Sequence, residues 1–133
     1  MNEYLPTALL VEDDHEIRRF VRAELEDEGW QVFETAMLDR AIDTAVTHRP
    51  DLIVLELGMP DGDSVDFIAS IRAGSTVPII VLAARVDEAQ IARAFETGAN
   101  DYLSKLFGVG TRFRAALRRL RPPQPDCMEN RHE

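Results

Sequence analysis

The sequence is poor in cysteine and in positive charge. Of its 133 residues one is a cysteine, Cys127, so no disulfide can form within the chain, as is compatible with a reducing compartment. Lys and Arg number 15 against 24 Asp and Glu, for a formal net charge of -9. Most of the chain is therefore a poor candidate for binding a nucleic-acid backbone. The length favours one domain.

Long apolar runs are also missing. No run approaches the roughly 18 residues that a membrane-spanning helix needs. Residues 1–4 carry no basic segment leading into an apolar one, so we expect no signal peptide. The expected location is the cytoplasm, without membrane contact.

Several kinds of chemistry lack their residues. No glycine-rich loop follows the first apolar run, which argues against a nucleotide cradle. The histidines, His15, His48 and His132, are too far apart in sequence for a metal-ligand motif. Ser64 and Ser104 have no nucleophile elbow around them. We therefore do not expect an enzyme.

What the chain does have is a regular alternation of two patterns. Short apolar runs predict strands at residues 7–11, 31–34, 51–56, 77–82 and 100–104. Between and after them, apolar residues recur at helical spacing, and these stripes include Phe20, Val46 and Phe95. Asp14, either Asp63 or Ser64, and Asp87 are the expected helix caps, and Gly110 is expected to precede the last helix. Five strand–helix pairs predict an α/β fold with a doubly wound parallel sheet.

Charged residues follow three of the predicted strands. Glu12 and Asp13 come after the first, Glu56 ends the third, and Lys105 follows the fifth. In an open α/β sheet the carboxyl ends of the strands meet where ligands bind. Carboxylates around such a cleft predict a site for a hard cation such as Mg²⁺.

Longer stretches around these residues carry a resemblance to a known family. They are residues 57–63 (LGMPDGD), 101–105 (DYLSK) and 107–110 (FGVG). Over about residues 7–121 the chain resembles the receiver domain of bacterial two-component response regulators, and most of all the Kdp potassium-response, OmpR/PhoB-type transcription regulators. The resemblance implies a flavodoxin-like (βα)5 receiver fold with strand order 2-1-3-4-5. We expect a receiver domain at residues 1–121 and a Pro-rich polar tail or linker at 122–133.

The resemblance also implies roles for the strand-end residues. Glu12 and Asp13 match the acidic pair that holds Mg²⁺, together with the carbonyl of Gly58. Glu56 stands at the position of the aspartate that accepts phosphate. Lys105 matches the lysine that pairs with the phosphoryl oxygens.

Two further positions match the switch of this family. Ala83 stands where relatives have a Ser or Thr whose hydroxyl binds the phosphate. Tyr102 stands at the aromatic switch position, which turns inward when that hydroxyl moves.

Three of these matches depart from the family pattern. The extra methylene of Glu56 moves the carboxylate by more than about 1 Å, which can cost about a hundredfold in rate, and should crowd the metal position or reach Lys105. Ala83 has no hydroxyl to link site and switch. In the family a proline follows the lysine, and the peptide bond between them is cis. Leu106 stands in the place of that proline, so we predict a trans 105–106 peptide.

The surface that relatives use for dimerisation is altered too. It consists of the fourth helix, fifth strand and fifth helix. Ile91, Asn100 and either Ala115 or Ala116 replace residues of the family's ion pairs, whereas Asp101 is retained. We expect a weakened homodimer. Ile91 and Phe95 offer an apolar contact to a partner, or they belong to the core. The core interpretation suits Phe95 better than Ile91.

Arginines crowd the last predicted helix. They are Arg112, Arg114, Arg118, Arg119 and Arg121. A solvated helix face is the favoured interpretation, with nucleic-acid contact as the alternative.

Two functions follow from these observations. The first is a phosphorylation-independent or impaired receiver that regulates a transcriptional output, with a sensor histidine kinase or another signalling protein as partner. The second is a competent, Mg²⁺-dependent phosphoacceptor that phosphorylates itself on Glu56 and controls a DNA-binding domain absent from this chain. A flavodoxin-like small-molecule binder that shares only the architecture is a third option.

Overall fold

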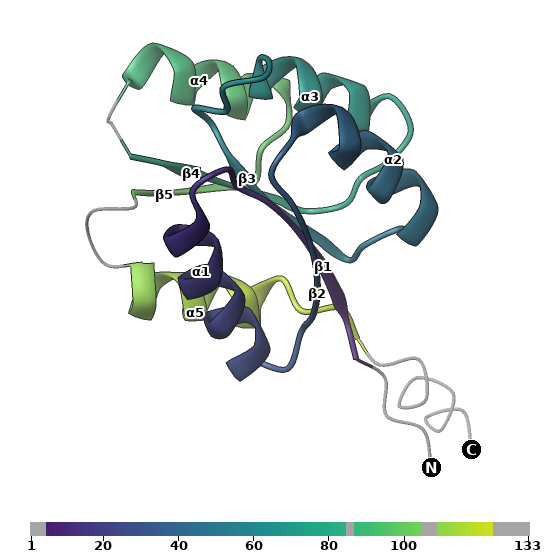
Figure 1. Ribbon diagram of the computed structural model, residues 1–133, viewed down its shortest axis with the longest axis vertical. Helices are drawn as coiled ribbons and strands as arrows, with labels where there is room; N and C mark the ends of the chain where they lie inside the picture. The colour runs from purple at the N-terminus through teal and green to yellow at the C-terminus, as the bar shows by residue number, and fades with distance from the viewer. Residues whose placement is uncertain (1–4, 85–86, 105–108, 124–133) are drawn as a thin grey trace.

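The fold is a five-stranded sheet between two layers of helices (Figure 1). The computed structural model describes residues 5–84, 87–104 and 109–123. All strands pair in parallel in the order β2-β1-β3-β4-β5, which confirms the predicted fold. The strands are β1 (Thr7–Val11), β2 (Gln31–Thr35), β3 (Leu52–Glu56), β4 (Ile79–Ala83) and β5 (Asp101–Ser104).

Helices cover both faces of this sheet. They are α1 (His15–Asp27), α2 (Leu38–His48), α3 (Ser64–Arg72), α4 (Glu88–Thr97) and α5 (Val109–Arg119). Helices α2, α3 and α4 lie on one face, and α1 and α5 on the other (Figure 1). None of the helices within the described ranges is long and apolar enough to cross a membrane.

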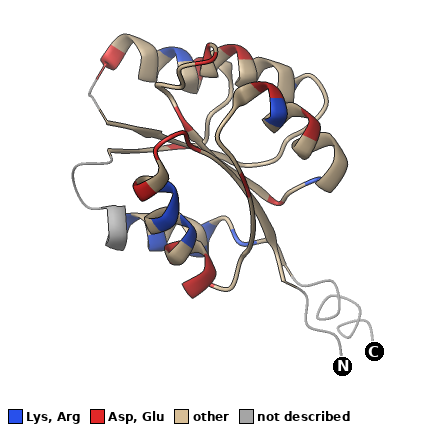
Figure 2. Ribbon diagram, in the orientation of Figure 1, with Lys and Arg blue, Asp and Glu red and all other residues tan. Residues whose placement is uncertain are grey.

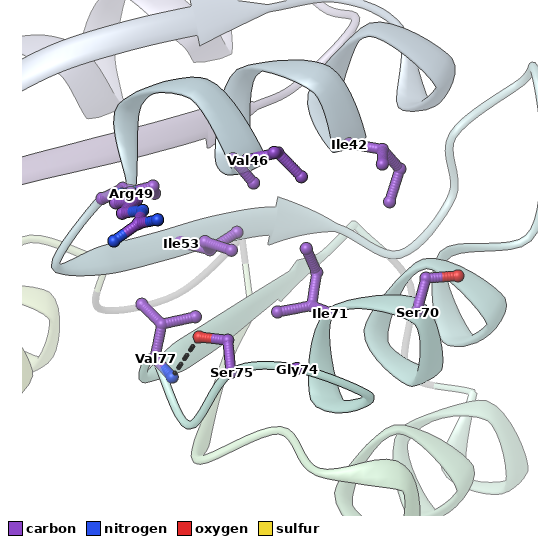
Figure 3. Close-up of a pocket in the computed structure, with 11 residues that line it drawn as sticks. Ile42, Val46, Arg49, Ile53, Ser70, Ile71, Gly74, Ser75 and Val77 are labelled. Atoms are coloured by element: carbon purple, nitrogen blue, oxygen red, sulfur yellow. Dashed lines mark hydrogen bonds between the residues drawn. The ribbon is translucent and has the colours of Figure 1, made fainter.

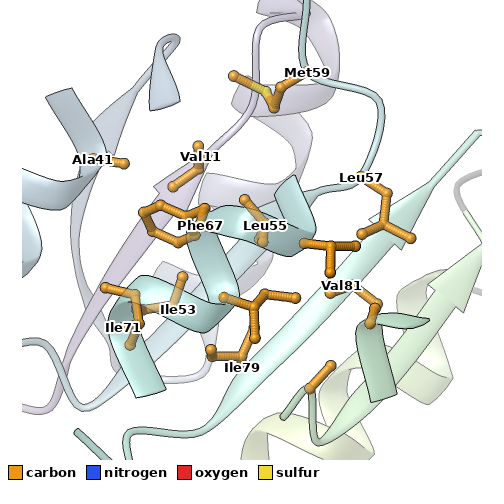
Figure 4. Packing of buried hydrophobic residues seen from close by; sticks show 14 of the residues in the cluster. Val11, Ala41, Ile53, Leu55, Leu57, Met59, Phe67, Ile71, Ile79 and Val81 are labelled. Carbon is orange, nitrogen blue, oxygen red and sulfur yellow. The ribbon is translucent and has the colours of Figure 1, made fainter. Parts of the chain in front are cut away.

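The central strands are buried on both sides, so they consist of uninterrupted apolar runs. Successive side chains point to opposite faces of the sheet. Ile53 and Leu55 pack into the cluster beneath α2, α3 and α4 (Figure 4). Leu52 and Val54 pack into the cluster beneath α1 and α5, which also contains Trp30. The sheet therefore separates two apolar cores.

Aspartates cap three of the helices as expected. The Asp14 carboxylate accepts the N–H groups of Glu16 and Ile17, and that of Asp87 accepts the N–H of Gln90. Of the two candidates for α3, Asp63 is the cap, because its carboxylate accepts the N–H of Val65 at 2.8 Å.

Three residues of the predicted apolar stripes lie at the surface. Phe20, Val46 and Phe95 are 48%, 70% and 43% exposed. Their assignment to the buried stripes was wrong, because a helix on a sheet buries only one stripe and these side chains fall outside it. The reading of Phe95 as core was likewise wrong, since Ile91 is the residue that packs against the cluster under α4.

Some element boundaries differ from the sequence prediction. Strand β4 runs from Ile79 to Ala83, so it begins two residues later than predicted. Helix α5 begins at Val109, so Gly110 lies in its first turn instead of preceding it. Ends of elements depend on tertiary hydrogen bonds as well as on local pattern.

Basic segments of α5 lie beside α1, which carries acidic segments (Figure 2). The arginines of α5 form ion pairs with α1, with the residue after it and with the sheet. Arg114 pairs with Glu24 of α1 at 2.8 Å, and Arg118 pairs with Glu28 just after α1 at 3.1 Å. The hydrogen bond from Arg118 holds the pKa of the Glu28 carboxyl below its ordinary value. These contacts favour the reading of α5 as a solvated, ion-paired face.

Candidate functional site

Strand register brings Glu12 and Glu56 to the same edge of the sheet. Val11 of β1 pairs with Leu55 of β3, so the next residues, Glu12 and Glu56, follow side by side. Glu12 is fully buried and Glu56 is 5% exposed. Buried carboxylates need polar partners, which makes this edge the polar centre of an otherwise apolar fold.

The carboxylate of Glu56 turns back onto its own loop. Its Oε2 accepts the N–H of Gly58 at 2.7 Å. A Cβ at position 58 would lie 2.9 Å from the same oxygen, so a larger residue there would make the Glu56 side chain shift. The backbone of Glu56 is held as well, because the buried Ser64 Oγ donates to its carbonyl at 2.7 Å.

The acidic loop after β1 is held by neighbours of its own. The Glu12 carboxylate accepts the N–H of Asp14 at 3.2 Å, and its carbonyl accepts Nη1 of Arg18 at 2.8 Å. Arg18 also pairs with Glu34 at 2.9 Å. Asp13, in contrast, is exposed. The two members of the acidic pair thus differ: Glu12 is built into the fold and Asp13 faces solvent.

The carboxylates at this edge are held by contacts within the chain. Within the described ranges, no three His, Cys, Asp or Glu side chains are grouped to hold a metal. One oxygen of Glu56 lies on the Gly58 N–H, and Glu12 is fully enclosed. Octahedral Mg²⁺ needs oxygens that face a common, hydrated position.

Lys105 and Leu106 lie outside the described residues. The predicted salt bridge from Glu56 to Lys105 and the trans 105–106 peptide therefore stay predictions.

Ala83 and Tyr102 lie on the same face of the sheet. Ala83, at the end of β4, pairs with Ser104, and Val81 pairs with Tyr102. Ala83 is 5% exposed, and Tyr102 packs, partly buried, against the same cluster beneath α4. Position 83 offers only a methyl group toward the Glu56 edge, so it cannot donate a hydrogen bond.

Helix α4 is linked directly to the loop after Glu56. Gln90 Nε2 donates to the carbonyl of Leu57 at 3.1 Å. Arg93 pairs with Asp63 at 3.4 Å, and a hollow of about 480 Å³ lies between the loop and the helix. These residues did not emerge from the sequence, because a contact between a loop and a distant helix leaves no periodic signal.

Asn100 and Asp101, which the sequence placed on the expected dimerisation surface, make contacts within the chain. Asn100 Oδ1 accepts the N–H of Ile79 at 2.8 Å and Nη2 of Arg72 at 3.0 Å. Asp101 pairs with Arg119 at 2.8 Å. Of the two alanines that were candidates for the altered position in α5, Ala115 is exposed and Ala116 is buried.

Comparison with known proteins identifies this architecture. The model of the response regulator receiver domain matches residues 8–119. The chain belongs to this family. It is 50% identical over 118 residues to the KDP operon transcriptional regulatory protein KdpE of Escherichia coli K12, covering 86% of this chain and 52% of that protein. It is 36% identical over 120 residues to the phosphate regulon protein PhoB of the same strain, covering 86% of this chain and 52% of that protein.

Solved structures agree with the assignment. A putative response regulator from Chloroflexus aurantiacus superposes with a TM-score of 0.80 at 26% identity, covering 90% of this chain and all (100%) of the other. The chemotaxis response regulator CheY4 of Vibrio cholerae has a TM-score of 0.78 at 27% identity, with 88% and 99% covered. The chain spans about half the length of the curated relatives named above. It is a KdpE-like receiver domain of a two-component response regulator.

Proposed function

We propose that this receiver domain signals without depending on phosphorylation, or with impaired phosphorylation, and regulates a transcriptional output in the cytoplasm. Its partner is a sensor histidine kinase or another signalling protein, and any DNA contact is made by an output domain beyond this chain. The receiver extends over residues 1–121, with 122–133 as tail or linker. It has no enzymatic activity beyond any residual self-phosphorylation.

The position of the Glu56 carboxylate is the observation that carries this proposal. In-line attack on a phosphodonor needs a carboxylate oxygen that faces incoming phosphate and a cation beside it. Here Oε2 lies 2.7 Å from the Gly58 N–H, and the side chain is 5% exposed. The Glu56 carboxylate thus accepts a hydrogen bond from its own loop.

Ala83 supports the proposal independently. Even a phosphoryl group on Glu56 would find no hydroxyl at position 83. The link between site and switch would have to run elsewhere, and the hydrogen bond from Gln90 to the Leu57 carbonyl offers such a path.

The proposal also includes a weakened homodimer through α4, β5 and α5. Asp101 is paired within the chain with Arg119, and Asn100 binds Arg72 and the backbone of Ile79. Any homodimer through α4, β5 and α5 would therefore have fewer ion pairs than the family pattern provides.

Intact mass measurement tests the main proposal. The protein is incubated with acetyl phosphate and Mg²⁺, so that a phosphoryl group would pass to a carboxylate oxygen and acetate would leave. We expect no stoichiometric adduct on the chain as it stands. The Glu56→Asp variant, and Glu56→Asp combined with Ala83→Ser, serve as matched comparisons in which we expect an adduct to appear.

A stoichiometric adduct on Glu56 itself, located by peptide mapping, would overturn the proposal in favour of a competent phosphoacceptor. Mg²⁺ titration of the same variants, followed by amide chemical shifts of residues 12–14 and 56–58, separates the two functions further. Shifts confined to the Asp variants are the expected result.

A further inference from the structure

A pocket of about 520 Å³ lies between α2 and α3, near the amino end of β3 (Figure 3). Ile53, near the start of β3 and fully buried, lies at its base, and Arg49, Ser70 and Ser75 are its polar lining residues. The other apolar lining residues are Ile42, Ala45, Val46, Pro50, Ile71 and Val77. The volume falls within the range of about 300–1,000 Å³ typical of small-molecule sites.

Arg49 stands at the rim of this pocket in a conformation that costs energy. It is the residue that ends α2, with φ 47 and ψ 64, and is the only non-glycine residue with positive φ in the described chain. Glycine or asparagine usually takes such a position, and another residue costs about 1–2 kcal/mol. A strained arginine at this position suggests a use for its side chain.

The Arg49 guanidinium is available for a ligand. Its side chain is exposed, and among the described residues it makes no hydrogen bond or ion pair, although the backbone N–H donates to Ala45 at 3.0 Å. The arginines of α5 differ in this respect, since Arg114, Arg118 and Arg119 all have carboxylate partners. The positive charge at the pocket rim is thus uncompensated locally.

Val46 adds an independent sign of a binding surface. It lines the pocket and is 70% exposed, the highest exposure among the large apolar residues that the structure describes. On the wall formed by the loop after α3, the Ser75 Oγ accepts the N–H of Val77 at 3.0 Å (Figure 3). Apolar walls with a few convergent polar groups are the usual composition of a ligand pocket.

We propose that this pocket binds a small amphipathic anion. Its apolar body would lie against Ile42, Val46 and Val77, which keep accessible surface, and its carboxylate or other oxyanion would receive paired hydrogen bonds from Arg49. The concave shape favours a small molecule over a flat protein partner. The site does not depend on the function proposed for Glu56.

The test is fluorescence titration with anilinonaphthalene sulfonate, a probe with an apolar body and one anionic group. We expect saturable binding by the folded protein. Arg49→Gly should weaken it by about tenfold or more, because a charge-assisted hydrogen bond is lost. The same variant should raise the melting temperature, because glycine relieves the positive φ, so unfolding cannot explain the loss.

Charge variants at the rim sharpen the test without disturbing the core. Val46→Lys should strengthen binding and Val46→Asp should weaken it, since this side chain already lies in solvent. Arg40→Gln, at an exposed position on the same helix, should leave the affinity unchanged.

Three results would overturn the proposal. If Arg49→Gly binds the probe as tightly as the parent protein, Arg49 does not contact the anion. If Arg40→Gln loses as much affinity as Arg49→Gly, the effect of Arg49 is only one of overall charge. Concentration-dependent dimerisation abolished by Arg49→Gly, with no probe bound by the monomer, would assign the pocket to a second copy of the chain.

Discussion

Glu56 differs from an aspartate by the reach of its side chain. One more methylene lets Oε2 arrive at the Gly58 N–H, 2.7 Å away, two residues along the chain. A hydrogen bond to an ionised acceptor is worth about 1.5–3 kcal/mol when its geometry is good. The Glu56 side chain thus supports its own loop.

Gly58→Ala probes this contact. The added Cβ would lie 2.9 Å from Glu56 Oε2, so we expect that carboxylate to shift and weaken its hydrogen bond, with a loss of about 0.5–1.5 kcal/mol in the free energy of unfolding, measured by urea denaturation. In a Glu56→Ala background the crowded oxygen is gone, so the same change should cost less than about 0.5 kcal/mol. Equal costs in both backgrounds would place the strain elsewhere.

Ser64 holds the backbone of Glu56, although the sequence indicated it only as one of two candidate caps of a helix. Its Oγ is buried and donates to the Glu56 carbonyl. We expect Ser64→Ala to lower the free energy of unfolding by about 1–3 kcal/mol, because a buried acceptor loses its donor. Ser70→Ala, at an exposed position of the same helix, should change it by no more than about 0.5 kcal/mol.

At the level of elements, α4 is tied to the loop after β3 by two contacts of different kinds. Gln90 reaches the Leu57 carbonyl and Arg93 reaches Asp63. Leu57 and Gly58 are neighbours, so the Glu56 carboxylate and α4 contact adjacent residues of the same loop. This connection does not pass through position 83.

Removal of the Gln90 side chain should therefore loosen α4. In Gln90→Ala we expect faster amide hydrogen exchange in the first turns of α4 and in residues 57–59, with exchange in α1 unchanged. Gln31→Ala, on the exposed side of β2, is the control. Unchanged exchange in α4 would mean that packing of Ile91 and Ala94 alone holds the helix.

The elements were largely predictable because their causes are local. Apolar runs gave β1 at its observed bounds, and aspartate caps marked the starts of α1, α3 and α4. The exposure of Phe20 and Val46 was not predictable, since it depends on how each helix is rotated against the sheet. The conformation of the Glu56 side chain was not predictable either, because a rotamer depends on neighbours that only the folded chain brings together.

Across the whole molecule, acidic residues outnumber basic ones, yet many of the arginines are engaged with carboxylates. Glu34 pairs with both Arg18 and Arg22. Burial raises the pKa of Glu34, but the hydrogen bonds from these arginines outweigh it and hold the pKa below its ordinary value of 4.5. Arginine contacts also lower the pKa of Glu28.

Acid should therefore destabilise the fold in a defined window. A carboxyl with a lowered folded-state pKa contributes stability above its unfolded pKa, and this stability is lost as pH falls through the folded value. We expect the free energy of unfolding to decline below pH 4.5. Glu34→Gln should cost up to about 1 kcal/mol at neutral pH and flatten the decline, because the pair is partly exposed. Glu96→Gln, at an exposed position, should reproduce the parent curve.

The two apolar cores give this molecule a built-in optical reporter. Trp30 is the only tryptophan, is 3% exposed and lies in the core beneath α1 and α5. Ala83 and Tyr102 pack on the other face of the sheet. Indole emission should therefore stay blue and constant while α4 shifts, and move to longer wavelength only when the α1–α5 layer opens. The intrinsic fluorescence of this chain thus measures unfolding, and a signal from the switch face would need a label on that side of the sheet.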